Sequence, residues 1–150
     1  MSKEMLELTV DKFTFRVPKG LCYNDAGVWV KQEGSMARLG LSDFAQQRSG
    51  DMAFAEVKPI ETVLKPGDEV ASVETIKVNI SLPSPVTGTI VEINTELQDA
   101  PEWINQDPYG KGWLVVMQLT DWESDKARLL NADAYYALIK RQAEEEVKKS

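Results

Sequence analysis

Apolar and polar residues alternate over short stretches through most of the chain, and turn residues separate these stretches. Residues 8–17 alternate in this way, with Phe13, Phe15 and Val17 as the apolar positions near the end. This period of two predicts a half-buried strand. Two further apolar stretches flank a loop that contains Gly34, which predicts a hairpin.

The middle of the chain repeats this pattern. Strands are predicted at 28–30, 37–41, 52–57, 69–76, 78–82, 89–94 and 113–117. A Pro-Gly pair at 66–67 predicts a turn. A second turn is predicted at 85–88, with a positive φ at Gly88, because glycine adopts this conformation without steric cost. Many short strands at close spacing favour a sandwich or barrel over alternating strands and helices.

Helices are predicted at a few places between and after the strands. Ser42 can cap a short helix by accepting an unpaired backbone N–H, and Gly50 stands where that helix would end. Pro101 suits the first turn of a second short helix that runs through Ile104, with Asp99 as its cap.

The end of the chain predicts an amphipathic helix over 133–149, with Ala134, Leu138 and Ile139 on its apolar side. The predicted fold is therefore mainly β. We expect a sandwich or flattened barrel of two small sheets, with peripheral helices and a C-terminal helix. The length of 150 residues and the 43% hydrophobic content suit one domain over 1–150 with its own core.

Composition excludes several classes of function. The chain has no histidine, which removes the commonest neutral-pH base and metal ligand, so we expect no catalytic residue and no metal site. Cys22 is the single cysteine and cannot form an internal disulfide, which fits a reducing compartment. The net charge of −7 argues against nucleic-acid binding, since that depends on basic surface.

The N-terminal segment lacks an apolar run long enough for a signal peptide or a membrane span. It also lacks the arginine-rich character of a transit peptide. The sequence therefore predicts a cytoplasmic protein that does not associate with membranes.

Lys77 lies between two predicted strands, at the tip of a predicted hairpin. A lysine amine can be acylated, and its flexible stem then carries the attached group away from the protein surface. The pattern alone leaves a second interpretation open, in which Lys77 is one of 17 basic residues and keeps a strand end soluble.

The segment Glu-Thr-Ile-Lys at 74–77 resembles the attachment motif of lipoyl carrier proteins. Other matching segments lie at 39–46, 84–88, 97–102 and 105–114. Together they resemble the H proteins of the glycine cleavage system along nearly the whole chain. Simple lipoyl domains lack the segments after residue 97. Biotin carriers usually place methionine on both sides of the modified lysine, whereas Ile76 and Val78 flank it here.

This resemblance implies a lipoyl-domain-like fold and a non-catalytic carrier with lipoate attached to Lys77 as a swinging arm. Glu74 would help the modifying enzyme, a lipoate ligase or an octanoyl transferase followed by lipoyl synthase, to recognise the hairpin. The implied partners are glycine decarboxylase (P protein), aminomethyltransferase (T protein) and dihydrolipoyl dehydrogenase (L protein). The carrier would pass an aminomethyl group among them during glycine catabolism.

The chain departs from the family at two places. H proteins typically carry His-Glu before a tryptophan in the first strand, where this chain has Gly27 and Val28 before Trp29. The two residues after the lysine are usually small, whereas here they are Val78 and Asn79. Two alternatives therefore stay open: an H-like, lipoate-based sulfur carrier in sulfur metabolism, and an interaction domain without modification.

Overall fold

The computed structural model describes residues 5–149. The strands are β1 (Met5–Val10), β2 (Phe13–Pro18), β3 (Cys22–Tyr23), β4 (Val28–Glu33), β5 (Met36–Leu41), β6 (Met52–Val57), β7 (Val63–Leu64), β8 (Glu69–Thr75), β9 (Asn79–Pro83), β10 (Gly88–Ile93) and β11 (Val115–Leu119). The helices are α1 (Asp43–Ser49), the 3₁₀ helix η1 (Thr95–Gln98), α2 (Trp103–Gln106), α3 (Trp122–Lys126) and α4 (Ala132–Lys149).

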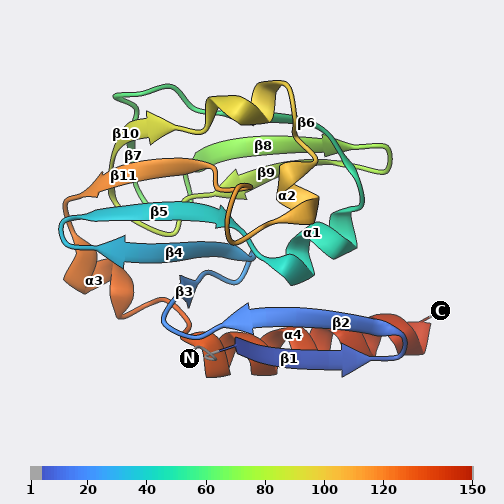
Figure 1. Cartoon of the computed structure of the whole chain (residues 1–150). Coiled ribbons are helices and arrows are strands. Elements are labelled where there is room, and N and C mark those ends of the chain that lie inside the picture. Colours follow the sequence, from blue (N-terminus) through green and yellow to red (C-terminus); the bar gives the residue numbers. More distant parts are fainter. Residues whose placement is uncertain (1–4, 150) are drawn as a thin grey trace.

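The strands form antiparallel sheets (Figure 1). A six-stranded sheet has the order β3-β4-β5-β11-β10-β7, and a three-stranded sheet has the order β6-β8-β9. The hairpin β1–β2 stands apart from both, beside α4. The expected mainly β fold is confirmed. The two larger sheets correspond to the two that the sequence predicts, and the two-stranded hairpin is added to them.

The prediction of a single strand over 8–17 is wrong, because the chain reverses in the middle of this stretch. Asp11 has a φ of 59°, a conformation that aspartate tolerates better than most residues, and it lies in the turn that connects β1 to β2. Leu8 then pairs with Phe15 across the hairpin. Both arms keep the alternation of apolar and polar residues, so the period of two does not distinguish one strand from two.

Two groups of buried side chains hold the molecule together. The larger lies between the two main sheets and includes Val30 and Leu39 from one sheet and Val73 and Leu82 from the other. The second lies between the hairpin, α1 and α4, and its members include Leu8, Phe15, Val17, Phe44, Tyr135 and Ile139. The hairpin is therefore part of the folded core and not a loose extension.

The start and end predicted for the first helix are confirmed. The Ser42 hydroxyl accepts the N–H of Ala45 at 3.2 Å, and Gly50 closes α1 with a φ of 95°. The cap predicted for the second helix is wrong. Asp99 ends η1, whereas α2 begins after Glu102, which makes no side-chain capping bond.

The position of Gly88 also differs from the prediction. It begins β10 as a strand residue and is not among the glycines with positive φ, so it does not form the turn predicted at 85–88. A Cβ atom at Gly88 would lie 2.1 Å from the carbonyl oxygen of Gln118 on the paired strand β11. The glycine is needed because two backbones approach closely, which a local turn pattern cannot reveal.

The C-terminal helix forms as predicted, but its buried side differs by a residue. The buried residues of α4 are Ala132, Tyr135, Ile139 and Ala143, at the three- and four-residue spacing of one helix face. Ala134 is exposed, and its predicted place on the apolar side is wrong. No helix among residues 5–149 is long and apolar enough to cross a membrane.

Candidate functional site

Lys77 lies in the turn that joins β8 to β9, as the sequence predicts. Glu74 and Asn79 form the last paired positions of the two strands before the turn. The turn residues Ile76, Lys77 and Val78 are exposed, and Ile76 shows 96% of its surface to solvent. The tip of this hairpin is therefore open to a partner protein from several directions.

Thr75 holds the turn in place from below. Its buried hydroxyl accepts the N–H of Lys77 at 3.2 Å and the N–H of Val78 at 3.1 Å. The Thr75 N–H also donates to the Val78 carbonyl at 2.9 Å. Thr75 belongs to the Glu-Thr-Ile-Lys segment, but the sequence pattern predicted no role for it in the turn, although threonine hydroxyls commonly accept backbone N–H groups in local turns. The lysine thus has a fixed backbone and a free side chain.

The Lys77 amine lies beside the end of α1. Its Nζ donates to the carbonyl oxygen of Arg48 at 3.3 Å, one of the last carbonyls of that helix. These carbonyls have no partner within the helix and attract a cation. The Lys77 side chain also passes Gly50, where a Cβ atom would lie 3.2 Å from its Cε. Within residues 5–149, no ion pair involves Lys77, so no carboxylate has to be displaced before the amine reacts.

Glu74 is exposed on the outer face of the three-stranded sheet, one residue before Thr75. Its neighbours Val73 and Thr75 are buried on the opposite face. Across the described residues, no ion pair engages Glu74. Its carboxylate is therefore available to a partner that approaches the Lys77 turn.

A hollow of about 390 Å³ lies next to the turn, between Val78 and the end of α1. Its apolar lining includes Leu41, Ala45, Ile80 and Leu82. Among residues 5–149, Asp25 is the only acidic residue that lines it. The lining residue Arg48 directs its guanidinium elsewhere, to Glu146 at 3.0 Å. The hollow can shelter an apolar group and has one carboxylate at hand.

Gly27 and Val28, which stand where the family typically has His-Glu, are packed inside the molecule. Gly27 has a φ of 90°, and a Cβ atom there would lie 2.8 Å from the Cβ of Ala45. The same Cβ would lie 3.1 Å from the hydroxyls of Ser42 and Tyr135, which hydrogen-bond to each other at 2.6 Å. Val28 is fully buried between the sheets. This packing leaves no room for a histidine at position 27.

Other reactive groups have structural surroundings. Cys22 is half-buried, and burial raises the pKa of its thiol, which disfavours the nucleophilic thiolate. Trp29 is buried and donates to the Pro108 carbonyl at 3.0 Å. No cluster of metal-binding side chains is found within residues 5–149. The Lys77 turn is thus the strongest candidate site.

Comparison with known proteins gives a consistent match. The family model described as glycine cleavage H-protein matches residues 21–142. The glycine cleavage system H protein of Oceanobacillus iheyensis is 42% identical over 123 residues, which are 82% of this chain and 97% of the relative. The H protein of Staphylococcus haemolyticus is 41% identical over the same shares of the two chains.

A solved structure agrees with these sequence matches. The crystal structure of a glycine cleavage system H protein from Mycobacterium marinum superposes with a TM-score of 0.70 at 28% identity. The superposition covers 81% of this chain and 97% of that chain. The hairpin β1–β2 precedes the residues that the family model matches.

Proposed function

The chain belongs to the glycine cleavage H-protein family, and on this premise we propose that it is a lipoyl carrier with lipoate attached to Lys77. The observation that carries the proposal is the Lys77 turn itself: its backbone is fixed by Thr75 and its amine is exposed. A tethered group needs both a rigid base and a free arm to meet successive partners at high effective concentration.

The residues around Lys77 fit a lipoyl group. The amine makes a single hydrogen bond to a backbone carbonyl, and no carboxylate among the described residues competes for it. The apolar hollow beside the turn suits the hydrocarbon part of such an arm. When bound, lipoate supplies a dithiolane that can be reduced and can carry a group on sulfur, while partner enzymes catalyse.

The cargo that we propose is the aminomethyl group of glycine cleavage. The carrier then works without catalysing, in the cytoplasm, with glycine decarboxylase, aminomethyltransferase and dihydrolipoyl dehydrogenase. Asp25 supports this assignment, because it is an exposed acidic residue at the hollow and a carboxylate attracts an ammonium group. A lipoate ligase, or an octanoyl transferase followed by lipoyl synthase, attaches the arm, and Glu74 contributes to its recognition.

A sulfur cargo is the second candidate. Gly27 and Val28 remove the charged pair that the family typically has before the tryptophan, and the packing around Gly27 keeps a larger side chain out. A neutral or anionic sulfur group would not need that pair. The Gly27 packing is the specific observation that favours this candidate.

The attachment is tested by incubating the purified chain with lipoate ligase, ATP and lipoate, followed by intact mass measurement and peptide mapping. We expect one lipoyl group, on Lys77 alone. Lys77→Arg should remain unmodified and keep its circular dichroism spectrum, because the side chain is exposed. Modification of another lysine, or none under conditions that lipoylate a known H protein, would leave the unmodified interaction domain as the better assignment.

The cargo is tested with the lipoylated chain. For an aminomethyl carrier, glycine–bicarbonate exchange with P protein should run as with an ordinary H protein. Slow exchange together with ready loading of thiosulfate-derived sulfur would favour the sulfur carrier. Dihydrolipoyl dehydrogenase should reoxidise the reduced arm in either case, since that reaction needs access to the two sulfurs only.

A further inference from the structure

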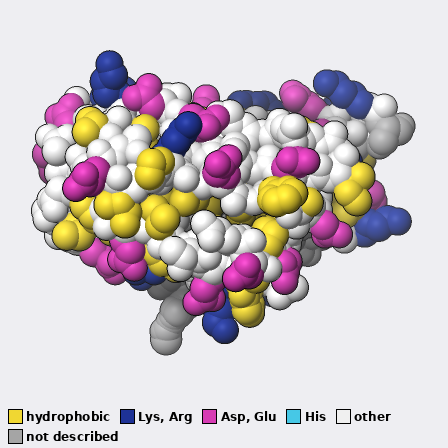
Figure 2. Space-filling view, turned by 90° about the horizontal axis from the view of Figure 1, so that it is seen from above, with side chains coloured by type: hydrophobic (Ala, Val, Ile, Leu, Met, Phe, Trp, Pro, Cys, Tyr) yellow, Lys and Arg dark blue, Asp and Glu magenta, His cyan; other side chains and the backbone are white. Residues whose placement is uncertain are grey.

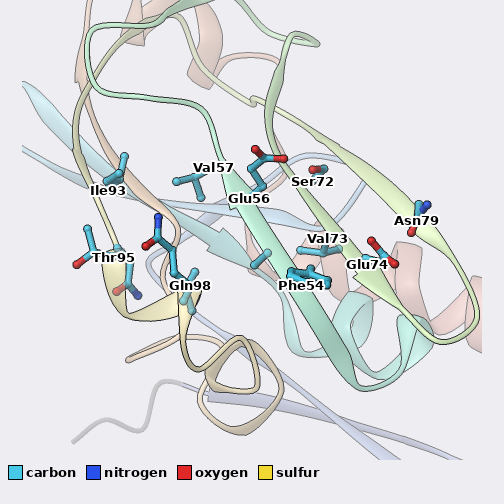
Figure 3. Close-up of a pocket in the computed structure, with 13 residues that line it drawn as sticks. Phe54, Glu56, Val57, Ser72, Val73, Glu74, Asn79, Ile93, Thr95 and Gln98 are labelled. Carbon is cyan, nitrogen blue, oxygen red and sulfur yellow. The ribbon is translucent and has the colours of Figure 1, made fainter.

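A groove of about 710 Å³ runs along the edge of β6 from the last strand pair before the Lys77 turn, Glu74 and Asn79 (Figure 3). Glu56, Ser72 and Glu74 lie on the strand side of this groove, which we call the β6 groove. Ile93 and Thr95 lie on the opposite side, at the end of β10 and in η1. The β6 groove is separate from the hollow next to α1, because the two share no lining residue.

Some backbone N–H and C=O groups of β6 point toward this groove. The Lys58 N–H donates to the Val70 carbonyl, so in the antiparallel ladder the N–H and C=O of Glu56 also pair with β8. Ala55 and Val57 stand at the alternate positions, and their N–H and C=O groups therefore point away from β8. Both residues line the groove, where an extended peptide segment can bond to these groups.

The side chains of the groove define the partner's chemistry. Phe54 lines it with 67% of its surface exposed, so its ring can pack against an apolar side chain of a partner. Glu56 and Glu74 are the charged residues of its lining, and no ion pair within the described part of the chain neutralises either of them. The molecule seen from above shows acidic and hydrophobic side chains together with a few Lys and Arg side chains (Figure 2). A basic segment with an apolar side chain complements the two glutamates and the phenylalanine of the groove.

We propose that the β6 groove is the docking surface for the enzyme that acylates Lys77, which lays an extended basic segment along it. This inference rests on the proposed function. An acylating enzyme must select Lys77 among the other lysines of the chain, and an amine alone does not distinguish them. Glu74 lines the groove only three residues before Lys77, so an enzyme that covers the hairpin tip also reaches the groove.

The chemistry at the tip is an ordinary acyl transfer. Lipoate and ATP give an acyl-adenylate and pyrophosphate on the enzyme. The Lys77 amine attacks the acyl carbon, the bond to the AMP oxygen breaks, and the amine proton passes to solvent. No oxidation or reduction occurs. The groove takes no part in these steps, so its loss should weaken binding and leave the rate of the bound complex unchanged.

The test is steady-state kinetics of lipoate ligase with ATP, lipoate and the purified unmodified chain. The double variant Phe54→Ser/Glu56→Lys should raise the KM for the carrier by about tenfold and leave kcat within about twofold. The matched control Phe13→Ser/Glu144→Lys changes an exposed phenylalanine and an exposed glutamate that do not line the groove. It should keep the wild-type KM. Added salt should raise the wild-type KM more than that of Glu56→Gln.

A second readout separates docking from damage to the turn. The reaction of Lys77 with a small acylating reagent, followed by peptide mapping, should be equal in the wild type and the double variant. An unchanged KM, or a loss in kcat alone, would overturn the proposal. If the ligase does not acylate Lys77 of the wild type, the proposed function fails together with the docking proposal. If the wild type is acylated and the double variant keeps the wild-type KM, only the docking proposal fails.

Discussion

Thr75 is buried beneath the turn that it stabilises, and its single hydroxyl serves several backbone groups. It accepts from the N–H groups of Lys77 and Val78, and it lies 3.3 Å from the Val78 carbonyl. Valine has the same shape but no hydroxyl. Replacing Thr75 by valine therefore removes the hydroxyl from the turn without creating a cavity.

Thr75→Val should lower the free energy of unfolding by about 1–3 kcal/mol, because N–H groups close to the core lose their acceptor. Acylation of Lys77 by a ligase should slow as well, since the turn is no longer fixed. Thr75→Ser keeps the hydroxyl and should restore most of the rate. Denaturant unfolding and the ligase assay measure the two effects, and equal rates for the valine and serine variants would contradict this role.

Substitution of Gly88 tests the close approach of the backbones of β10 and β11. Its Cβ position is filled by the Gln118 carbonyl, whereas a Cβ at Gly34 would meet nothing within 4 Å. Gly34→Ala should cost about 1–2 kcal/mol for its positive φ alone. Gly88→Ala should cost more, because strands β10 and β11 must move apart. Urea unfolding of the two variants compares them directly, and a smaller loss at position 88 would show that the strands yield easily.

At the scale of elements, the β1–β2 hairpin is an addition in front of the family match that shares a core with the matched part. Phe15 packs edge-on against Phe44 of α1 with ring centroids 4.9 Å apart. The Arg16 N–H donates to Asp43 at 2.9 Å, at the start of the same helix. The end of α1 in turn contacts Lys77 through the Arg48 carbonyl. The hairpin thus supports the helix beside the candidate site.

Phe15→Ala should lower the free energy of unfolding by about 3–5 kcal/mol, the usual cost of removing a buried phenylalanine ring. Phe13→Ala, two positions away, should change it by less than about 0.5 kcal/mol, because Phe13 is 52% exposed. Thermal or urea unfolding of both variants provides the comparison. Similar losses for the two would mean that the hairpin does not pack on α1 as described.

For the whole molecule, buried tyrosines link stability to pH. Burial raises the pKa of Tyr135 to about 12, despite the hydrogen bond to Ser42, which acts in the opposite direction. Burial also raises the pKa values of Tyr23 and Tyr109 above their ordinary range. The chain contains no histidine, so the side chain that most often changes charge near neutral pH is absent.

Stability should therefore fall in alkali. Unfolded tyrosines release their protons near pH 10, whereas the folded ones hold them, so the unfolded state binds fewer protons. Stability contributed by Tyr135 is complete below pH 10 and is lost as pH rises toward about 12. Urea unfolding at pH 7, 9, 10 and 11 should show a decrease that starts near pH 10. The free energy of unfolding should decrease less in Tyr135→Phe. A wild-type free energy of unfolding that does not change with pH would contradict the raised pKa values of the buried tyrosines.

The sequence by itself determined the mainly β class, most strand positions, the capped helix after Ser42 and the Lys77 turn. Each of these follows from residues close together in the chain: a period of two, a hydroxyl before a helix, or breakers around a lysine. It also determined the family, because the matching segments extend along most of the chain. The lipoyl attachment at Lys77 and the role of Glu74 remain predictions.

Only the tertiary structure decided which distant segments meet. It divided 8–17 into a hairpin packed on α1 and α4, and it placed Gly88 against Gln118 of a strand far along the chain. It also brought β6 opposite η1 to form the β6 groove, and Gly27 against the Ser42–Tyr135 pair. These features depend on contacts between residues far apart in the chain, and the local alternation of side chains is the same whichever distant partner is chosen.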